Sequence, residues 1–111
     1  MLFRSAGAKV LGRDYVAALQ ARETMYAAVE KVLGRYSALL TLPSCGPAPK
    51  GLGSTGNAVF NGMWTLLGVP CITLPWSSGP VDLPLGVQLV GAFGEDTALL
   101  TRAHWVAQAL A

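Results

Sequence analysis

The chain has 111 residues, of which 52% are hydrophobic and only 13% are charged, and its formal net charge is +2. This composition excludes an intrinsically disordered chain. The eight basic residues are scattered along the sequence, so we expect no nucleic-acid partner. A chain this short has a high surface-to-volume ratio and cannot hide so much apolar surface within itself. We therefore expect that it associates, or that it is a piece of a larger fold.

Targeting and membrane segments are not expected. The first residues are not followed by the long apolar stretch of a signal peptide. The longest apolar stretch, from Trp64 to Trp76, is interrupted by Gly68, Pro70 and Pro75 and is too short to span a bilayer. These features predict a cytoplasmic protein with no membrane partner.

The first predicted element is a long amphipathic helix that follows an irregular segment over residues 1–12. From Arg13 onward, apolar residues recur at three- and four-residue spacing, and charged residues mostly occupy the other face. Gly34 is a plausible stop signal for this helix. The apolar positions are Tyr15, Val16, Leu19, Met25, Tyr26, Val29, Val32 and Leu33.

The rest of the chain predicts short strands, a loop and two further helices. Three apolar runs bounded by proline or glycine predict strands at 37–42, 71–74 and 85–90. A loop rich in proline and glycine covers 43–56, and Asn57 can cap a short helix over 58–67. Glu95 and Asp96 suit the start of a last helix. The order predicts an α/β unit of about three strands, two long helices and one short helix, with unpaired sheet edges.

Residues 51–56 match the spacing G-x-G-x-x-G of phosphate-binding loops. Such a motif should follow a buried strand directly and should precede an acidic residue by about 20 positions. Here seven residues, 44–50, intervene after Pro43, and no acidic residue lies at 74–78. We interpret these glycines as a structural loop.

No self-sufficient catalytic site follows from the residue types. Ser77 and Ser78 precede Gly-Pro, as ordinary turn residues do. His104, the one histidine, lies on the last helix with no carboxylate placed to orient it. Lys50 lies in a polar loop, where its amine is solvated rather than activated by burial.

The cysteines give no indication of a metal or redox site. Cys45 and Cys71 form no Cys-x-x-Cys pair, and one histidine cannot complete a zinc site with them at a familiar spacing. We expect free, structurally inert thiols, and a disulfide has no positive support. No metal and no cofactor are expected.

Three segments in this order resemble a known family. The motifs N-x-x-W-T-L-L-G-V-P at 61–70 and L-P-L-G-V-Q-L-V-G at 83–91 are the most specific, and a third segment covers 38–49. The chain resembles the C-terminal portion of an amidase-signature enzyme, a family of amidases and glutamyl-tRNA amidotransferase A subunits. The resemblance covers most of residues 13–111, which we interpret as an amidase C-terminal-like α/β unit, a partial domain.

The resemblance implies a fragment of a single large α/β/α domain built on a mixed sheet. Members of the family hydrolyse or transfer amides with a Ser–Ser–Lys triad, in which one serine is the nucleophile. The second serine, in a cis peptide, connects it to a lysine that acts as acid and base. Those residues lie in the N-terminal and central parts of the family sequence, which have no counterpart here. Ser77 and Ser78 come too late in the order of elements, so no catalytic residue is carried over.

The family's C-terminal part helps to line the substrate pocket, and the segment before the Gly-Val-Pro turn lies near it. On that basis Asn61, Trp64 and Thr65 are the candidate substrate-binding residues. The alternative is that Trp64 is a core residue and Asn61 a cap or turn group, which are the commoner roles of these residue types.

Two functions remain open. The first is a C-terminal fragment or subunit of an amide-hydrolysing enzyme, inactive alone, whose partner is an N-terminal amidase half. The second is a non-catalytic α/β protein derived from an amidase that forms a homo-oligomer, so that a second copy covers its apolar faces and strand edges.

Overall fold

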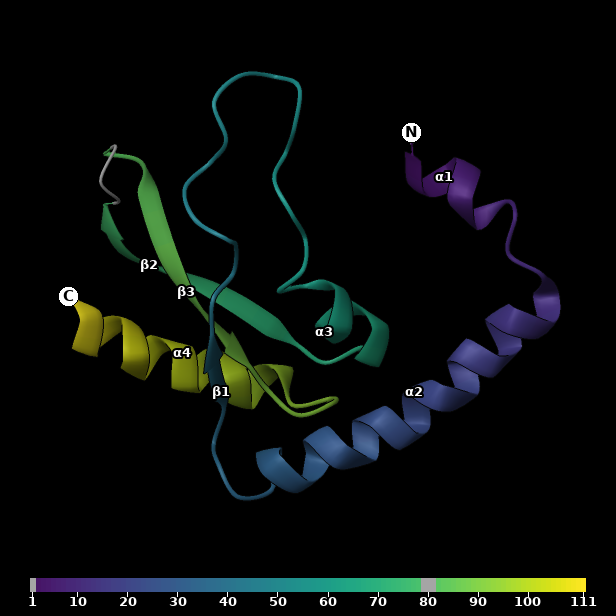
Figure 1. The fold of residues 1–111 in the computed structure, drawn as a ribbon. Helices are drawn as coiled ribbons and strands as arrows, with labels where there is room; N and C mark the ends of the chain where they lie inside the picture. Colours follow the sequence, from purple (N-terminus) through teal and green to yellow (C-terminus); the bar gives the residue numbers. More distant parts are fainter. Residues whose placement is uncertain (1, 79–81) are drawn as a thin grey trace.

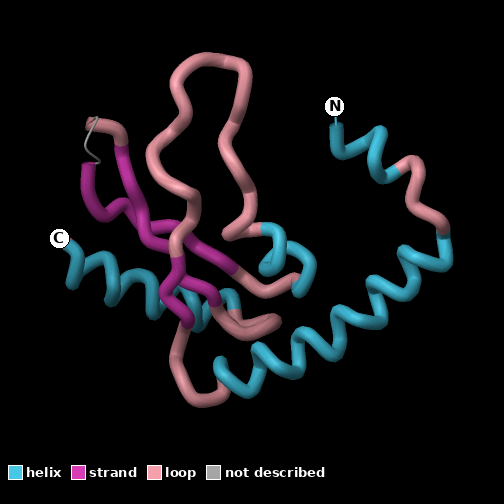
Figure 2. Tube along the Cα trace, viewed as in Figure 1, coloured by secondary structure: helices cyan, strands magenta, loops and turns pink. Residues whose placement is uncertain are grey.

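The computed structural model describes residues 2–78 and 82–111, which form four helices and a three-stranded sheet (Figures 1 and 2). The α/β fold class, the three strands and the two long helices are confirmed. In chain order the elements are α1 (Leu2–Gly7), α2 (Gly12–Leu33), β1 (Leu39–Thr41), α3 (Gly62–Leu67), β2 (Cys71–Ser78), β3 (Pro84–Val90) and α4 (Asp96–Leu110).

The sheet has the order β1-β3-β2, so the last strand in sequence lies in the centre. Val90 of β3 pairs with Leu39 on one side and with Cys71 on the other. Both pairings among the described residues are antiparallel. The family resemblance implied strands of a mixed sheet, whereas the three described strands form an antiparallel sheet.

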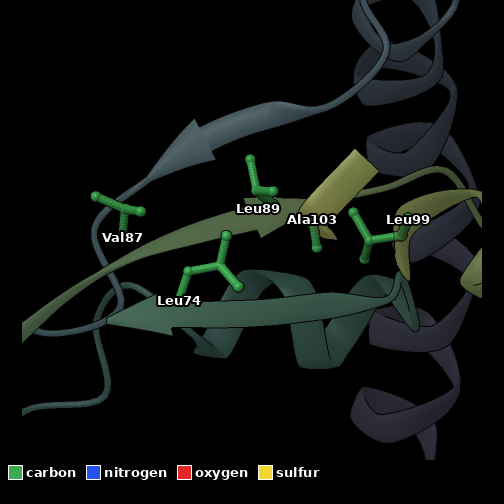
Figure 3. Close-up of a cluster of buried hydrophobic side chains, with 5 residues drawn as sticks. All are labelled: Leu74, Val87, Leu89, Leu99 and Ala103. Atoms are coloured by element: carbon green, nitrogen blue, oxygen red, sulfur yellow. The ribbon is translucent and has the colours of Figure 1, made fainter. Parts of the chain in front are cut away.

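The two faces of β3 are covered by different helices. Val87 and Leu89 face α4, where they pack with Leu74 of β2 and with Leu99 and Ala103 of the helix (Figure 3). Side chains alternate between the faces of a strand, so Gln88 and Val90 face the other way. Full burial of one Leu or Val side chain contributes about 1.5–3 kcal/mol, so this five-residue cluster is a main source of stability.

The opposite face of the sheet is covered by α3. Trp64, Leu67 and Val69 pack with the fully buried Val90. The helix ends at Gly68, which adopts the left-handed conformation (φ 69°) that glycine tolerates best. This turn sends the chain directly into β2.

Helix α2 is only partly covered. Its C-terminal half contributes the partly buried Tyr26 and Val29 to the core on the α3 side, and Leu33 near its end is buried. Tyr15 and Leu19 continue the same stripe toward the N-terminus, yet both are exposed, Tyr15 to 60%. Figure 1 shows this half of α2 extending away from the sheet. The predicted amphipathic helix is confirmed, but half of its apolar face has no cover within the described chain.

Three local predictions were wrong. The segment expected to be irregular contains the short helix α1, Leu2–Gly7. The short helix α3 begins at Gly62 rather than near residue 58, because Asn57 instead closes a local turn in which its Oδ1 accepts a hydrogen bond from the Val59 N–H (3.0 Å).

The third concerns strand β2, which continues beyond the proline that was expected to end it. Pro75 pairs with Gly86, and Ser77, predicted to lie in a turn, pairs with Leu85 after an irregularity in the register. Proline is tolerated here because β2 is an edge strand, where the missing N–H breaks no ladder bond on the outer side. The turn was predicted over 77–84, but Ser78 also pairs with Pro84 in the sheet, and residues 79–81 lie outside the described residues.

Candidate functional site

The long loop between β1 and α3 surrounds an open pocket of about 580 Å³. Because β1 ends at Thr41 and α3 begins at Gly62, the loop over 42–61 forms most of the pocket wall. The described residues lining it include no Asp, Glu, Lys, Arg or His. They are Pro43, Ser44, Cys45, Gly46, Pro47, Ala48, Pro49, Thr55, Gly56, Asn57, Ala58, Asn61 and Pro84.

A relay of side-chain hydrogen bonds joins the base of this pocket to the sheet. Thr41 Oγ1 donates to Gln88 Oε1 at 3.0 Å. Gln88 Nε2 donates to Asn61 Oδ1 at 2.8 Å, and Asn61 Nδ2 donates to the Pro43 carbonyl oxygen at 2.9 Å. The relay therefore connects two strands, the start of α3 and the start of the loop.

Gln88 is the one buried polar residue in the described part of the chain, with 5% of its surface exposed. A buried amide group without a hydrogen-bond partner costs about 1–3 kcal/mol. Both ends of the Gln88 amide have partners, so its burial is compensated. That compensation depends on Asn61 and Thr41 remaining in place.

The three predicted site residues lie on one turn at the start of α3 but have different surroundings. Asn61 lines the pocket, and its side chain makes no capping bond to the helix. Thr65 is exposed, and its hydroxyl donates to the Asn61 carbonyl oxygen at 3.0 Å. Trp64 is buried in the core on the α3 side, and neither Trp64 nor Thr65 is among the described residues that line the pocket. Asn61 and Thr65 are therefore in direct contact, whereas Trp64 points into the core.

Sequence reasoning did not assign Gln88 or Thr41 to the site. The available signal was that Gln88 is a lone polar residue in an otherwise apolar strand. A polar side chain at such a position needs a buried partner. Which partner it has depends on the antiparallel pairing of β1 with β3, which no local pattern indicates.

Both cysteines are free, and each exposes much of its surface. Cys45 lies in the wall of the pocket. Partial burial raises the pKa of the Cys71 thiol above its ordinary value, so little of it is thiolate at neutral pH. This agrees with the expectation of an unreactive thiol at Cys71.

Other groups weighed from the sequence lie apart from the pocket. His104 is exposed on α4 and contacts Gln108 through their side-chain nitrogens at 3.2 Å. Lys50 is exposed in the loop. Among residues 2–78 and 82–111, no three His, Cys, Asp or Glu side chains are grouped to hold a metal ion. No helix in the described chain is both long and apolar enough to cross a membrane.

Comparison with solved structures identifies relatives of this fold. An amidase crystal structure matches 96% of this chain with 31% sequence identity and a TM-score of 0.82, and the chain spans 27% of that amidase. The A subunit of the glutamyl-tRNA(Gln) amidotransferase of Thermotoga maritima matches 77% of the chain with 27% identity and a TM-score of 0.66, over 20% of its own length. No family model matches the sequence, and neither does any curated protein. The resemblance found in the sequence is confirmed: this chain has the fold of a portion, about a quarter, of an amidase.

Proposed function

We propose that this chain is the C-terminal portion of an amide-hydrolysing enzyme of the amidase-signature family. It contributes strands to the sheet and one wall of the substrate pocket, and it depends on a separate catalytic portion for activity. The observation that carries this proposal is the match itself, which covers 96% of this chain but only 27% of the amidase.

The surface of the chain supports the proposal of an incomplete domain. Its radius of gyration is 16.5 Å, whereas a compact chain of this length has a radius of about 13 Å. Its accessible surface is 8492 Å², whereas a folded monomer of this mass exposes about 5,800 Å². The difference, about 2,700 Å², is larger than the roughly 800 Å² that each partner buries in a standard interface, as expected of a chain that is part of a larger domain.

The chemistry of the pocket supports binding rather than bond cleavage by this chain alone. Its described lining includes no His, Lys, Asp or Glu, so no acid–base group lies beside a nucleophile. The Ser44 hydroxyl donates to the Gly46 carbonyl oxygen at 2.8 Å and has no base beside it. An uncharged lining with the Asn61 amide suits an uncharged amide substrate. In this proposal Asn61 is the substrate-binding residue that lines the pocket. Thr65, whose hydroxyl donates to the Asn61 carbonyl oxygen, and Trp64, in the core, support Asn61 from outside the lining.

The direct test is an assay of ammonia release from simple aliphatic and aryl amides. The purified, folded chain is expected to release none above the buffer background. Turnover by the pure chain would overturn the proposed dependence on a separate catalytic portion.

The uncovered apolar surfaces also favour a second candidate, a self-associating protein without catalytic function. Besides the exposed half of α2, an apolar hollow of about 410 Å³ lies between β1 and α4, lined by Leu40, Leu42, Trp76 and Leu110 among others. A second copy could cover these surfaces. Light scattering after size exclusion distinguishes the candidates, because self-association requires a dimer or larger at micromolar concentration. A Leu19→Glu substitution on α2 should then dissociate it. A monomer would exclude this candidate.

A further inference from the structure

We propose that Gln88 is the positioning residue of the loop pocket, and that it holds the pocket in shape through Asn61 and Pro43. Gln88 would support the loop pocket from within the sheet. That this pocket binds substrate rests on the proposed function. The relay itself exists and can be tested without any substrate.

The direction of every hydrogen bond in the relay is fixed by its last member. The Pro43 carbonyl oxygen can only accept, so Asn61 must present its Nδ2 to it and its Oδ1 to Gln88. Gln88 must then present Nε2 to Asn61 and Oε1 to Thr41, whose hydroxyl donates. Reversing either amide would place two acceptors against each other. The relay therefore has one arrangement, and a change at Gln88 affects Pro43 through Asn61.

The relay is the long-range attachment of the loop among the described hydrogen bonds. Asn61 and Pro43 are 18 positions apart. By contrast, the Ser54 and Asn57 side chains each accept a hydrogen bond from a backbone N–H two positions further along the chain. These local bonds shape turns but do not tie the loop to the sheet. Loss of the relay should therefore release the loop while leaving its turns intact.

A glutamine-to-glutamate change at Gln88 tests the donor role selectively. When ionised, the introduced carboxylate can still accept from Thr41 but can no longer donate to Asn61. When protonated, it has the shape of the amide and can donate through its hydroxyl. Burial in the sheet raises the pKa of such a carboxyl, which brings this transition toward neutral pH. The loop should thus be attached at low pH and released at higher pH in this variant alone.

Two measurements report whether the loop is released from the sheet. Lys50 is the one Lys or Arg between Arg35 and Arg102, so trypsin cleavage after Lys50 reports the loop. At pH 8, Gln88→Glu should increase this cleavage about fivefold, the factor expected from the loss of about one net hydrogen bond. The Asn61 side-chain NH₂ resonances in NMR spectra should keep their wild-type shifts at low pH and move away as the pH rises. The exposed Gln108→Glu variant is the matched control and should change neither readout.

Asn61→Asp gives a second, independent variant if the first folds poorly. It keeps an acceptor for Gln88 and removes the donor to Pro43, so it should also increase cleavage after Lys50. The inference is overturned if both variants are cleaved at the wild-type rate, or if cleavage after Arg35 and Arg102 increases equally. It is also overturned if the Asn61 resonances of Gln88→Glu show no pH-dependent return to the wild-type shifts. Amide binding is measured separately, so failure of the relay and failure of the proposed function are distinguishable.

Discussion

The side-chain amide of Asn61 donates to the carbonyl oxygen of Pro43 at 2.9 Å, which joins the two ends of the loop that forms the candidate pocket. The same side chain accepts from the buried Gln88. Asn61 therefore supports the pocket and also satisfies a buried amide. Its dual role makes it the most sensitive polar position in this region.

Asn61→Ala should lower the free energy of unfolding by about 1–3 kcal/mol, because it leaves the Gln88 Nε2 group without a partner. The matched control is Asn57→Ala, whose side chain only accepts a local N–H in an exposed turn. The control should cost less than about 1 kcal/mol. Urea unfolding followed by circular dichroism measures both. Equal losses would contradict the role assigned to Asn61.

Gly86→Ala should destabilise the pairing of β2 with β3. A Cβ at position 86 would lie 2.8 Å from both the Leu74 carbonyl oxygen and the Thr73 Cγ2, and the backbone oxygen cannot move without disturbing the ladder. Overpacking of this kind costs about 1–3 kcal/mol.

Gly53→Ala is the control for that substitution. A Cβ there meets no atom within 4 Å, so the change should be neutral or slightly stabilising. Thermal unfolding of the two variants compares them directly. A Gly86→Ala variant as stable as wild type would show that β2 and β3 are less closely paired than described.

Val90→Ala should remove about 2 kcal/mol of stability, because Val90 is fully buried in the central strand and its truncation leaves a cavity beside Trp64. Val59→Ala, at a site that is 62% exposed, should stay within about 0.5 kcal/mol of wild type. Guanidinium unfolding followed by tryptophan fluorescence measures both variants. If both variants unfold at the same midpoint, the core on the α3 side is wrongly placed.

Alkylation of Cys71 should be slow at neutral pH. Its rate should continue to rise with pH above about 8.5, the pKa of an ordinary thiol. Partial burial raises the pKa of this thiol, so the reactive thiolate forms only at higher pH. The stability linked to this group is fully present below the ordinary pKa and is lost as the pH rises through the raised value.

Iodoacetamide modification of a Cys45→Ser variant isolates this thiol. The same variant in urea gives the ordinary titration as a reference. The alkylation rate of the folded variant should reach half of its maximum at a higher pH than the rate in urea. A folded-state midpoint at the same or a lower pH would contradict the raised pKa.

Much of the fold could be predicted from the sequence because its signals are local. The spacing from Tyr15 to Leu33 predicted α2, and Gly34 correctly predicted where it ends. The acidic pair Glu95 and Asp96 correctly predicted the start of α4, which runs from Asp96 to Leu110. These features depend only on residues a few positions apart.

The features that were missed depend on contacts distant in sequence. Pro75 looked like a strand end, and only its place on an edge strand allows β2 to continue. Asn61 was proposed for the pocket from a family resemblance, but its link to Gln88 needs β3 to lie between β1 and β2. Trp64, adjacent in sequence to Thr65, lies in the core because helical rotation directs it to the sheet.

The most direct test of the central claim is to replace the matching segment of the amidase with this chain and to assay the folded chimera for amide hydrolysis. The chimera is expected to release ammonia from amides, and Asn61→Ala within it is expected to raise the KM. A chimera that unfolds cooperatively, as the parent amidase does, yet neither binds nor hydrolyses amides would contradict the claim that this chain supplies a working wall of an amidase pocket.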